Sequence, residues 1–139
     1  MRLLSYALMV VLLVSCSLDD SNDMQYRFEL LPITEVELPN SVRFGQVYSI
    51  RYTYAVPTTC HAYNDLYYVS EGNVRTIAVI TTVLEEAGNV RCEALTGQFE
   101  ERSFNFYVNE VAGVYVFRLW QGTDAEGHDV YRTYEIPIE

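Results

Sequence analysis

Acidic residues and a histidine crowd one short segment near the C-terminus. Asp124, Glu126, His128 and Asp129 follow one another between Gly122 and the next apolar run. Oxygen ligands at alternating positions could hold Ca²⁺, which takes six to eight of them. The D-x-[DN]-x-[DN]-G spacing of a calcium loop is absent, and acidic hairpin tips are commonly solvated. The sequence therefore predicts no metal site in this segment.

Other residue patterns give little support for catalysis. His61 and His128 could share a transition metal only if the fold joined two distant loops. The adjacent carboxylates Glu85-Glu86 and Glu100-Glu101 would point to opposite faces of a strand, whereas glycoside cleavage needs carboxylates opposed across a cleft. The sequence contains neither a G-x-S-x-G elbow nor a Gly-rich phosphate loop. We expect no enzymatic activity and no cofactor, with an atypical hydrolase as an alternative.

Aromatic side chains are the more suggestive candidates for binding. Tyrosine occurs 12 times, and Tyr63, Tyr67 and Tyr68 lie within one short stretch. Trp120 lies two residues after Arg118 in a predicted strand, so the two side chains share one face, near a loop. Large amphipathic rings make good recognition surfaces, and we predict these five residues as candidate binding residues. The alternative is that tyrosine is a favoured strand residue that fills the interior of a β-sandwich and leaves its hydroxyl in water.

The first of three cysteines, Cys16, closes an N-terminal leader. Met1-Arg2 precedes an apolar run from Leu3 to Val14, which is typical of a secretory signal and shorter than the roughly 20 residues of a membrane span. The following Leu13-Val14-Ser15-Cys16 resembles the lipobox of bacterial lipoproteins. The resemblance implies that residues 1–15 are a signal peptide, that the chain is cut before Cys16 and that Cys16 carries the acyl anchor. An ordinary secreted protein with a chance cysteine, or an uncleaved anchor, is the alternative.

A polar, acidic segment follows the lipobox. Residues 16–24 are predicted to form an acidic tether before a domain at residues 25–139, because they cannot bury apolar surface. Position 17 is Ser rather than Asp, the usual inner-membrane retention signal, and the acidic cluster resembles export signals that carry some lipoproteins to the cell surface. A plain solvated linker explains the cluster equally well. We expect the chain to be anchored in the bacterial outer membrane, in either the periplasmic or the surface-facing leaflet.

Charge excludes some partners. The chain has a formal net charge of −10 and contains no lysine, and loss of Arg2 with the leader takes the charge to −11. Such a surface disfavours nucleic acid and electrostatic binding to anionic membranes. Membrane attachment must then come from the acyl chains. An unknown protein or glycan is the expected ligand.

Two cysteines remain once Cys16 is assigned to lipid. Cys60 and Cys92 are too far apart in sequence for a C-x-x-C redox motif or a zinc knuckle. In an oxidising compartment they are predicted to form a disulfide. Two free buried thiols are the alternative.

The mature chain alternates apolar and polar residues with period 2 almost throughout. We predict one strand region at residues 26–31 and 33–38, interrupted at Pro32, and further strands at 46–55, 66–70, 74–84, 99–109, 114–120 and 130–138. Residues 57–65 are predicted to be a loop, residues 71–73 a hairpin turn, and residues 74–84 a central strand. In the 114–120 strand, alternation places Tyr115, Phe117 and Leu119 in the core, opposite Arg118 and Trp120.

About seven short strands in this length predict an all-β fold, an Ig-like antiparallel β-sandwich. Trp120 follows both cysteines, so the true Ig signature is missing. The stretch GVYVFRLWQGTDAEGHDVYRTYEIPI resembles the closing hairpin of small, uncharacterised Ig-like bacterial lipoproteins, and that resemblance implies no activity.

Two functions are compatible with these patterns. The first is a lipid-anchored, non-enzymatic binding or assembly module. The second is a periplasmic inhibitor lipoprotein that blocks a wall-degrading enzyme such as a lysozyme, because an acidic surface would be steered towards a basic enzyme. Inhibition needs a protruding loop, and the segment TTCHAYND, residues 58–65, is predicted to supply it.

Overall fold

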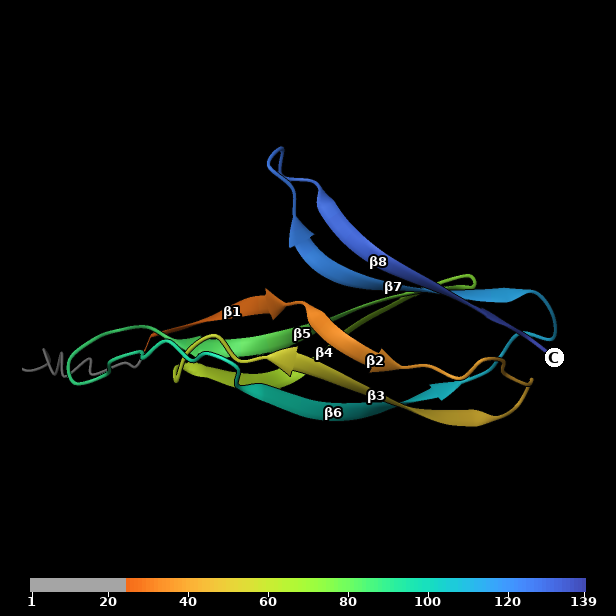
Figure 1. Cartoon of the computed structure of the whole chain (residues 1–139), viewed down its shortest axis with the longest axis horizontal. Helices are drawn as coiled ribbons and strands as arrows, with labels where there is room; N and C mark the ends of the chain where they lie inside the picture. The colour runs from red at the N-terminus through yellow and green to blue at the C-terminus, as the bar shows by residue number, and fades with distance from the viewer. Residues whose placement is uncertain (1–24) are drawn as a thin grey trace, which may run out of the picture.

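The computed structural model describes residues 25–139, which form a two-sheet β-sandwich (Figure 1). Its eight strands are β1 (Tyr26–Leu31), β2 (Ile33–Glu37), β3 (Val47–Ala55), β4 (His61–Glu71), β5 (Val74–Leu84), β6 (Phe99–Tyr107), β7 (Val114–Thr123) and β8 (Asp129–Pro137). One sheet has the order β1-β5-β7-β8, with β4 also pairing with β5, and the other has the order β2-β3-β6. The predicted all-β sandwich is confirmed. The predicted signal peptide, Cys16 and the tether lie outside the described residues.

The core lies between the two sheets and follows the predicted alternation. Tyr115, Phe117 and Leu119 of β7 are all buried, as predicted. They meet the alternate residues Ile50, Tyr52 and Tyr54 of β3, and Phe106 of β6, within one hydrophobic cluster. The ring of Phe106 packs edge-on against Tyr115 and Phe117, with centroids 4.8 and 5.0 Å apart. Such edge-to-face pairs add to the free energy gained by burying the rings themselves.

Pro32 divides one extended segment between the two sheets. Before it, β1 pairs with β5; after it, β2 pairs with β3. Proline has no N–H to donate to a ladder, so the chain changes sheets at the residue where pairing is already interrupted. This crossing is why the structure has eight strands where about seven were predicted.

Two strands share one edge of β5. β1 pairs with the C-terminal part of β5, from Leu31 opposite Val79 onward, and β7 pairs with the N-terminal part, ending at Leu119 opposite Ile77. The β5–β7 pair is parallel, in contrast to the antiparallel sandwich predicted. β4 covers the other edge of β5 along its whole length. β5 is therefore the central strand, as predicted.

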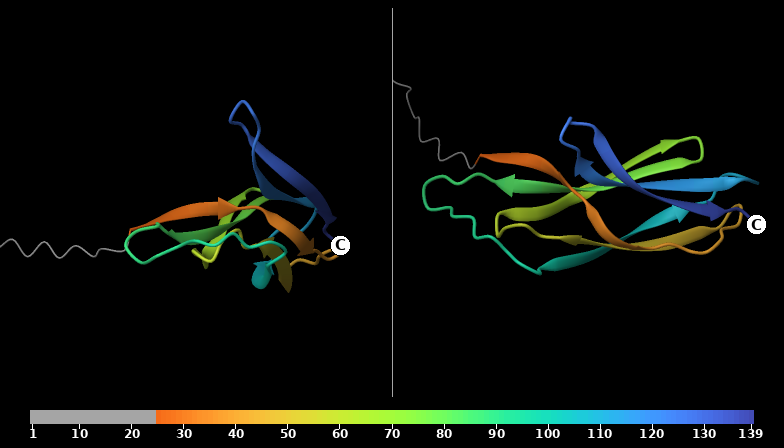
Figure 2. Two further views of the ribbon diagram at one scale, coloured as in Figure 1. Left: turned by 60° about the vertical axis from the view of Figure 1, so that its left-hand side comes forward. Right: turned by 45° about the horizontal axis from the view of Figure 1, so that its top comes forward.

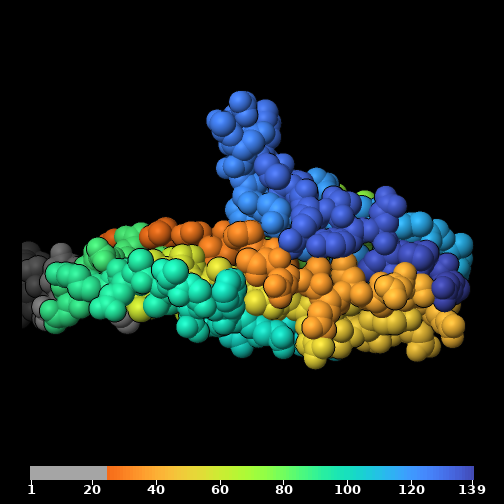
Figure 3. Space-filling view, viewed as in Figure 1, coloured from red at the N-terminus to blue at the C-terminus, as the bar shows by residue number. Residues whose placement is uncertain are grey.

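The β7–β8 hairpin leaves the sheet where β1 takes its place. Beyond Leu119 there is no free β5 edge for β7, so β7 and β8 continue as a two-stranded ribbon that stands out from the body (Figures 1 and 3). The register shifts between Trp120 and Thr123, and Gly122 within this bulge has φ of +108°, which a residue with a Cβ rarely adopts. The left view of Figure 2 shows the hairpin tip clear of both sheets, whereas its root is bonded to β2 through Gln121 and Arg132.

The predicted loop at residues 57–65 is wrong in its second half. β4 begins at His61, and its register with β5 shifts between Tyr63 and Asp65. A bulge places two residues opposite one and so breaks the period-2 pattern, which is why the sequence did not reveal this strand. Residues 58–65 do not protrude, since Cys60 is buried and Tyr63 pairs with Thr81. The protruding element is the β7–β8 hairpin.

The disulfide between Cys60 and Cys92 is present, as predicted. It joins the start of β4 to the connection between β5 and β6. Nowhere in residues 25–139 is there a helix long and apolar enough to cross a membrane.

Candidate functional site

One face of the five-stranded sheet points away from the core and is rich in apolar rings. Along β5, alternation turns Ala78 and Ile80 outward, opposite the buried Ile77 and Val79. Their cross-strand neighbours share this outer face: Tyr67 lies opposite Ala78, and Leu30 lies opposite Ile80. The sequence missed the part that β1 plays here, because its pairing partner is distant along the chain.

A shallow pocket opens on this outer face where β1, β4 and β5 lie side by side. It has a volume of about 430 Å³ and is lined by Phe28, Glu29, Leu30, Asn64, Tyr67 and Ile80, which we call the aromatic pocket. Phe28 is 61% exposed and Tyr67 is 39% exposed. Rings left this open to water are the usual mark of an interaction surface when they gather in one patch.

The root of the projecting hairpin carries a second group of side chains on the same outer face. We call Arg118, Trp120, Asp129 and Tyr131 the hairpin cluster. The indole N–H of Trp120 donates to Asp129 Oδ1 at 2.8 Å, and the Tyr131 hydroxyl donates to Asp129 Oδ2 at 3.2 Å. The Arg118 guanidinium lies 4.0 Å from the centroid of the Tyr131 ring. Each member is thus held in place by another, which lowers the entropy lost on binding a ligand.

Tyr67 of the aromatic pocket and Tyr131 of the hairpin cluster are linked electrostatically. The pKa of Tyr131 is raised, first by burial, then by Asp129, and also by the nearby Tyr67. Figure 3 shows the hairpin standing above β1. The hairpin therefore projects from the sheet at an angle, beside the outer face.

The structure divides the five predicted binding residues between two faces. Arg118, Trp120 and Tyr67 lie on the outer face. The alternation of the 114–120 strand predicted this for Arg118 and Trp120. The indole N–H of Trp120 is bonded to Asp129. Tyr63 and Tyr68 point between the sheets instead.

Tyr63 and Tyr68 contact core residues. The Tyr63 hydroxyl lies 3.2 Å from that of Tyr52, and the Tyr63 ring carries the Arg102 guanidinium at 4.7 Å from its centroid. Tyr68 packs against Phe104 with centroids 5.7 Å apart. Neither side chain belongs to the surface around Trp120.

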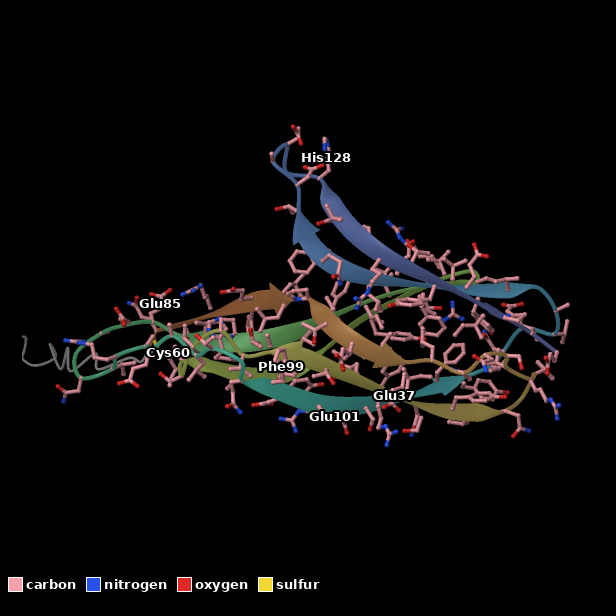
Figure 4. The ribbon with its side chains drawn as sticks, viewed as in Figure 1. Glu37, Cys60, Glu85, Phe99, Glu101 and His128 are labelled. Atoms are coloured by element: carbon pink, nitrogen blue, oxygen red, sulfur yellow. A yellow bond between two sulfur atoms is a disulfide. The ribbon has the colours of Figure 1, made fainter. Side chains whose placement is uncertain are left out.

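The two histidines lie apart. His128 is at the tip of the projecting hairpin, whereas Cys60, which precedes His61, is in the body (Figure 4). His61 Nδ1 lies 2.8 Å from Thr58 Oγ1. No group of three or more His, Cys, Asp or Glu side chains in residues 25–139 is arranged to hold a metal ion.

The acidic hairpin tip has a structural explanation. Asp124 Oδ1 accepts hydrogen bonds from the backbone N–H groups of Glu126 and His128, at 3.0 and 2.8 Å. Asp124 thereby closes its own turn, a role for which short acidic side chains are well suited. Glu126 and His128 remain exposed around it.

Comparison with known proteins supplies no relative for this arrangement: no family model, no curated protein and no solved structure matches the chain.

Proposed function

We propose that this chain is a lipid-anchored, non-enzymatic binding module of the bacterial outer membrane. The observation that supports it is the outer face, where the aromatic pocket presents the exposed rings of Phe28 and Tyr67 and the hairpin cluster adds the half-buried rings of Trp120 and Tyr131. The sequence supports the anchor, through the lipobox-like Leu13-Val14-Ser15-Cys16.

The partner is a protein with an apolar side chain set among basic residues. Leu30 and Ile80 give the pocket an aliphatic floor, which suits a protein side chain better than a polar sugar. Glu29 and Asp129 border the surface, and the whole chain carries a net charge of −10. Complementary charge on the partner would speed association and exclude acidic competitors.

The anchor is tested by metabolic labelling with a palmitate analogue in the producing cell. Wild-type chain should take up label, and Cys16→Ala should take up none and should accumulate as uncleaved precursor. Ser17→Ala is the matched control and should label like wild type. Equal labelling of wild type and Cys16→Ala would refute the anchor.

The binding surface is tested by affinity capture of the full-length chain from detergent-solubilised cells, comparing two exposed phenylalanines. Phe28→Ser changes the aromatic pocket, whereas Phe99→Ser changes an equally open ring on β6, at 53% exposure. A genuine partner should be lost about tenfold or more with Phe28→Ser and kept with Phe99→Ser, and its capture should weaken with added salt. Equal effects of both variants, or capture of cell-wall glycan alone, would contradict the proposal.

Inhibition of a basic wall-degrading enzyme is the second candidate, favoured by the protruding hairpin with its acidic tip. Here Glu126 would enter the enzyme's cleft, since its side chain is exposed and its turn is held by Asp124. The chain should slow lysis of cell-wall suspensions by lysozyme, and Glu126→Gln should relieve the inhibition. Undiminished lysis at a molar excess of wild-type chain would eliminate this candidate.

A further inference from the structure

Arg75 of β5 is a charged side chain in the core. Only 3% of its surface is exposed, and it alternates with the outward-facing residues of β5, so it points between the sheets. Its Nη1 donates to the carbonyl oxygens of Gly72 and Val74, at 2.5 and 2.9 Å, and its Nη2 donates to Asn109 Oδ1 at 3.3 Å. The guanidinium carbon lies 4.8 Å from the centroid of the Tyr115 ring.

These contacts leave the charge of Arg75 without a counter-ion. Every ion pair in the described part of the chain involves another arginine or a histidine. Buried charges in proteins are normally paired, because removing an ion from water is costly. Guanidinium has five N–H bonds, and the hydrogen bonds to Gly72, Val74 and Asn109 use three of them. Two donors therefore remain on a cation that lacks an anion.

A groove leads from solvent to this cation. It has a volume of about 470 Å³, and both Arg75 and Ser70 line it. It runs between β4 and β6, each of which pairs with only one strand and so forms an edge of its sheet. Ser70 is the cross-strand partner of Arg75, which sets its hydroxyl on the same face as the guanidinium. The volume is that of a small-molecule site.

The walls of the groove combine rings with hydroxyl groups. Tyr68 and Phe104 form an aromatic wall. Burial raises the pKa of Tyr68 while the adjacent Arg75 opposes the rise, so the phenol remains a neutral hydrogen-bond donor beside the cation. Asp65 also lines the groove, with its Oδ1 accepting from the N–H of Leu66.

We propose that this groove binds the carboxylate of a small organic acid, with Arg75 as the anchoring cation. The planar guanidinium matches a carboxylate, and the hydroxyls of Ser70 and Tyr68 lie beside it. A monoanion fits better than a phosphate dianion, because a single cation faces it and Asp65 adds a negative charge to the same groove. The rest of the ligand, of the size of an acidic monosaccharide or one amino-acid residue, packs on Tyr68 and Phe104.

The site is separate from the outer face that carries the proposed function. Neighbouring residues of a strand point to opposite faces, so Tyr68 lines the groove while Tyr67 lines the aromatic pocket. Loss of one site leaves the other intact, and the two proposals can fail independently.

Saturation-transfer NMR on the full-length chain tests the carboxylate site with three probes. Glucuronate and N-acetylglycine both carry a carboxylate, and glucose is the neutral match of the first. We expect saturable signals for the two acids and none for glucose, with inorganic phosphate failing to compete at equal concentration. The tighter of the two acids identifies the source as a sugar acid or a peptide end. Binding of glucose, displacement by phosphate or no saturable signal would overturn the assignment.

Two variants and a control separate ligand binding from folding. Arg75→Lys keeps the charge but loses the planar fork, and should weaken the acids at least tenfold. Ser70→Leu fills the groove without removing any hydrogen bond of Arg75, and should abolish their signals while the melting temperature stays near that of wild type. Ser103→Leu makes the same change at an exposed site on β6 and should bind normally. Retained binding in Ser70→Leu would refute the site even if Arg75→Lys failed to fold.

Discussion

Two tyrosine hydroxyls lie inside the core and make the domain sensitive to alkali. Tyr52 and Tyr54 are each 1% exposed. The pKa of Tyr52 is raised well above its ordinary 10.0, mainly by burial and then by its hydrogen bond with Tyr63. The pKa of Tyr54 is raised by burial and by its bond to Glu100. Neither can ionise in place without placing a phenolate in the core.

The folded state therefore keeps these two protons after the unfolded chain has lost them. The contribution of these two hydroxyls to the free energy of unfolding is complete below pH 10. It declines as the pH rises above 10, because the unfolded state then binds fewer protons than the folded state. The melting temperature should fall between pH 9.5 and 11.5, and Tyr52→Phe should make the fall less steep. Tyr107→Phe, an exposed site, should leave the slope unchanged; an equal effect of both variants would contradict the burial argument.

Trp120 should behave as a surface anchor rather than a core residue. It is half-buried and hydrogen-bonded to Asp129, so Trp120→Ala should cost less than the about 3–5 kcal/mol of a core Trp. Phe117→Ala, at a position with 0% exposure, should give the full core cost. Denaturant titrations of both variants measure the difference. Equal losses would place Trp120 in the core.

At the scale of elements, the disulfide fixes the start of β4. Cys60 and Cys92 are 32 residues apart, and a crosslink over such a loop contributes about 3–4 kcal/mol by the chain-entropy estimate. Cys60→Ala/Cys92→Ala should lower the free energy of unfolding by that amount, as measured in guanidinium. Under reducing conditions no crosslink remains to be removed. The loss should therefore exceed the difference between Cys92→Ser and wild type when both are measured in reductant. A loss below about 1 kcal/mol would show that the loop is ordered without it.

Alternation predicted the strand faces, and pairing between distant segments set the limits of prediction. The buried positions of β7 follow from local period, because a half-buried strand shows its inner face in its own sequence. The bulge between Tyr63 and Asp65 hid the first half of β4, which the sequence pattern assigned to a loop. The place of β1 beside β5 depends on a partner some 50 residues away, which no local pattern reveals. The aromatic pocket, built by that pairing, was therefore beyond sequence reasoning.

At the scale of the whole molecule, net charge opposes the compact state. The chain carries −10 without a single lysine, so like charges repel over much of the surface. Raising NaCl from 20 to 300 mM should raise the melting temperature by about 3 °C, since screening removes roughly 0.5 kcal/mol of repulsion from a domain of this size. Differential scanning calorimetry measures the shift. A flat or falling melting temperature would mean that local ion pairs outweigh the net charge.

Mechanical load between the N-terminal strand and the hairpin passes through β5 and through the hydrogen bonds that join the hairpin root to β2. β1, where the described chain begins, and β7, which leads into the projecting hairpin, are both bonded to the same edge of β5, one after the other. Part of any tension between Tyr26 and the hairpin therefore passes along β5, and part passes through β2, where Gln121 and Arg132 donate to the carbonyl oxygens of Ile33 and Thr34. Ladder hydrogen bonds run across the strands, so such tension stretches them in shear and divides the force among all of them, whereas a pull across the sheet would open them one at a time. A ligand that pulls the hairpin parallel to the strands, against an attachment at the other end, therefore loads these bonds in their most resistant direction.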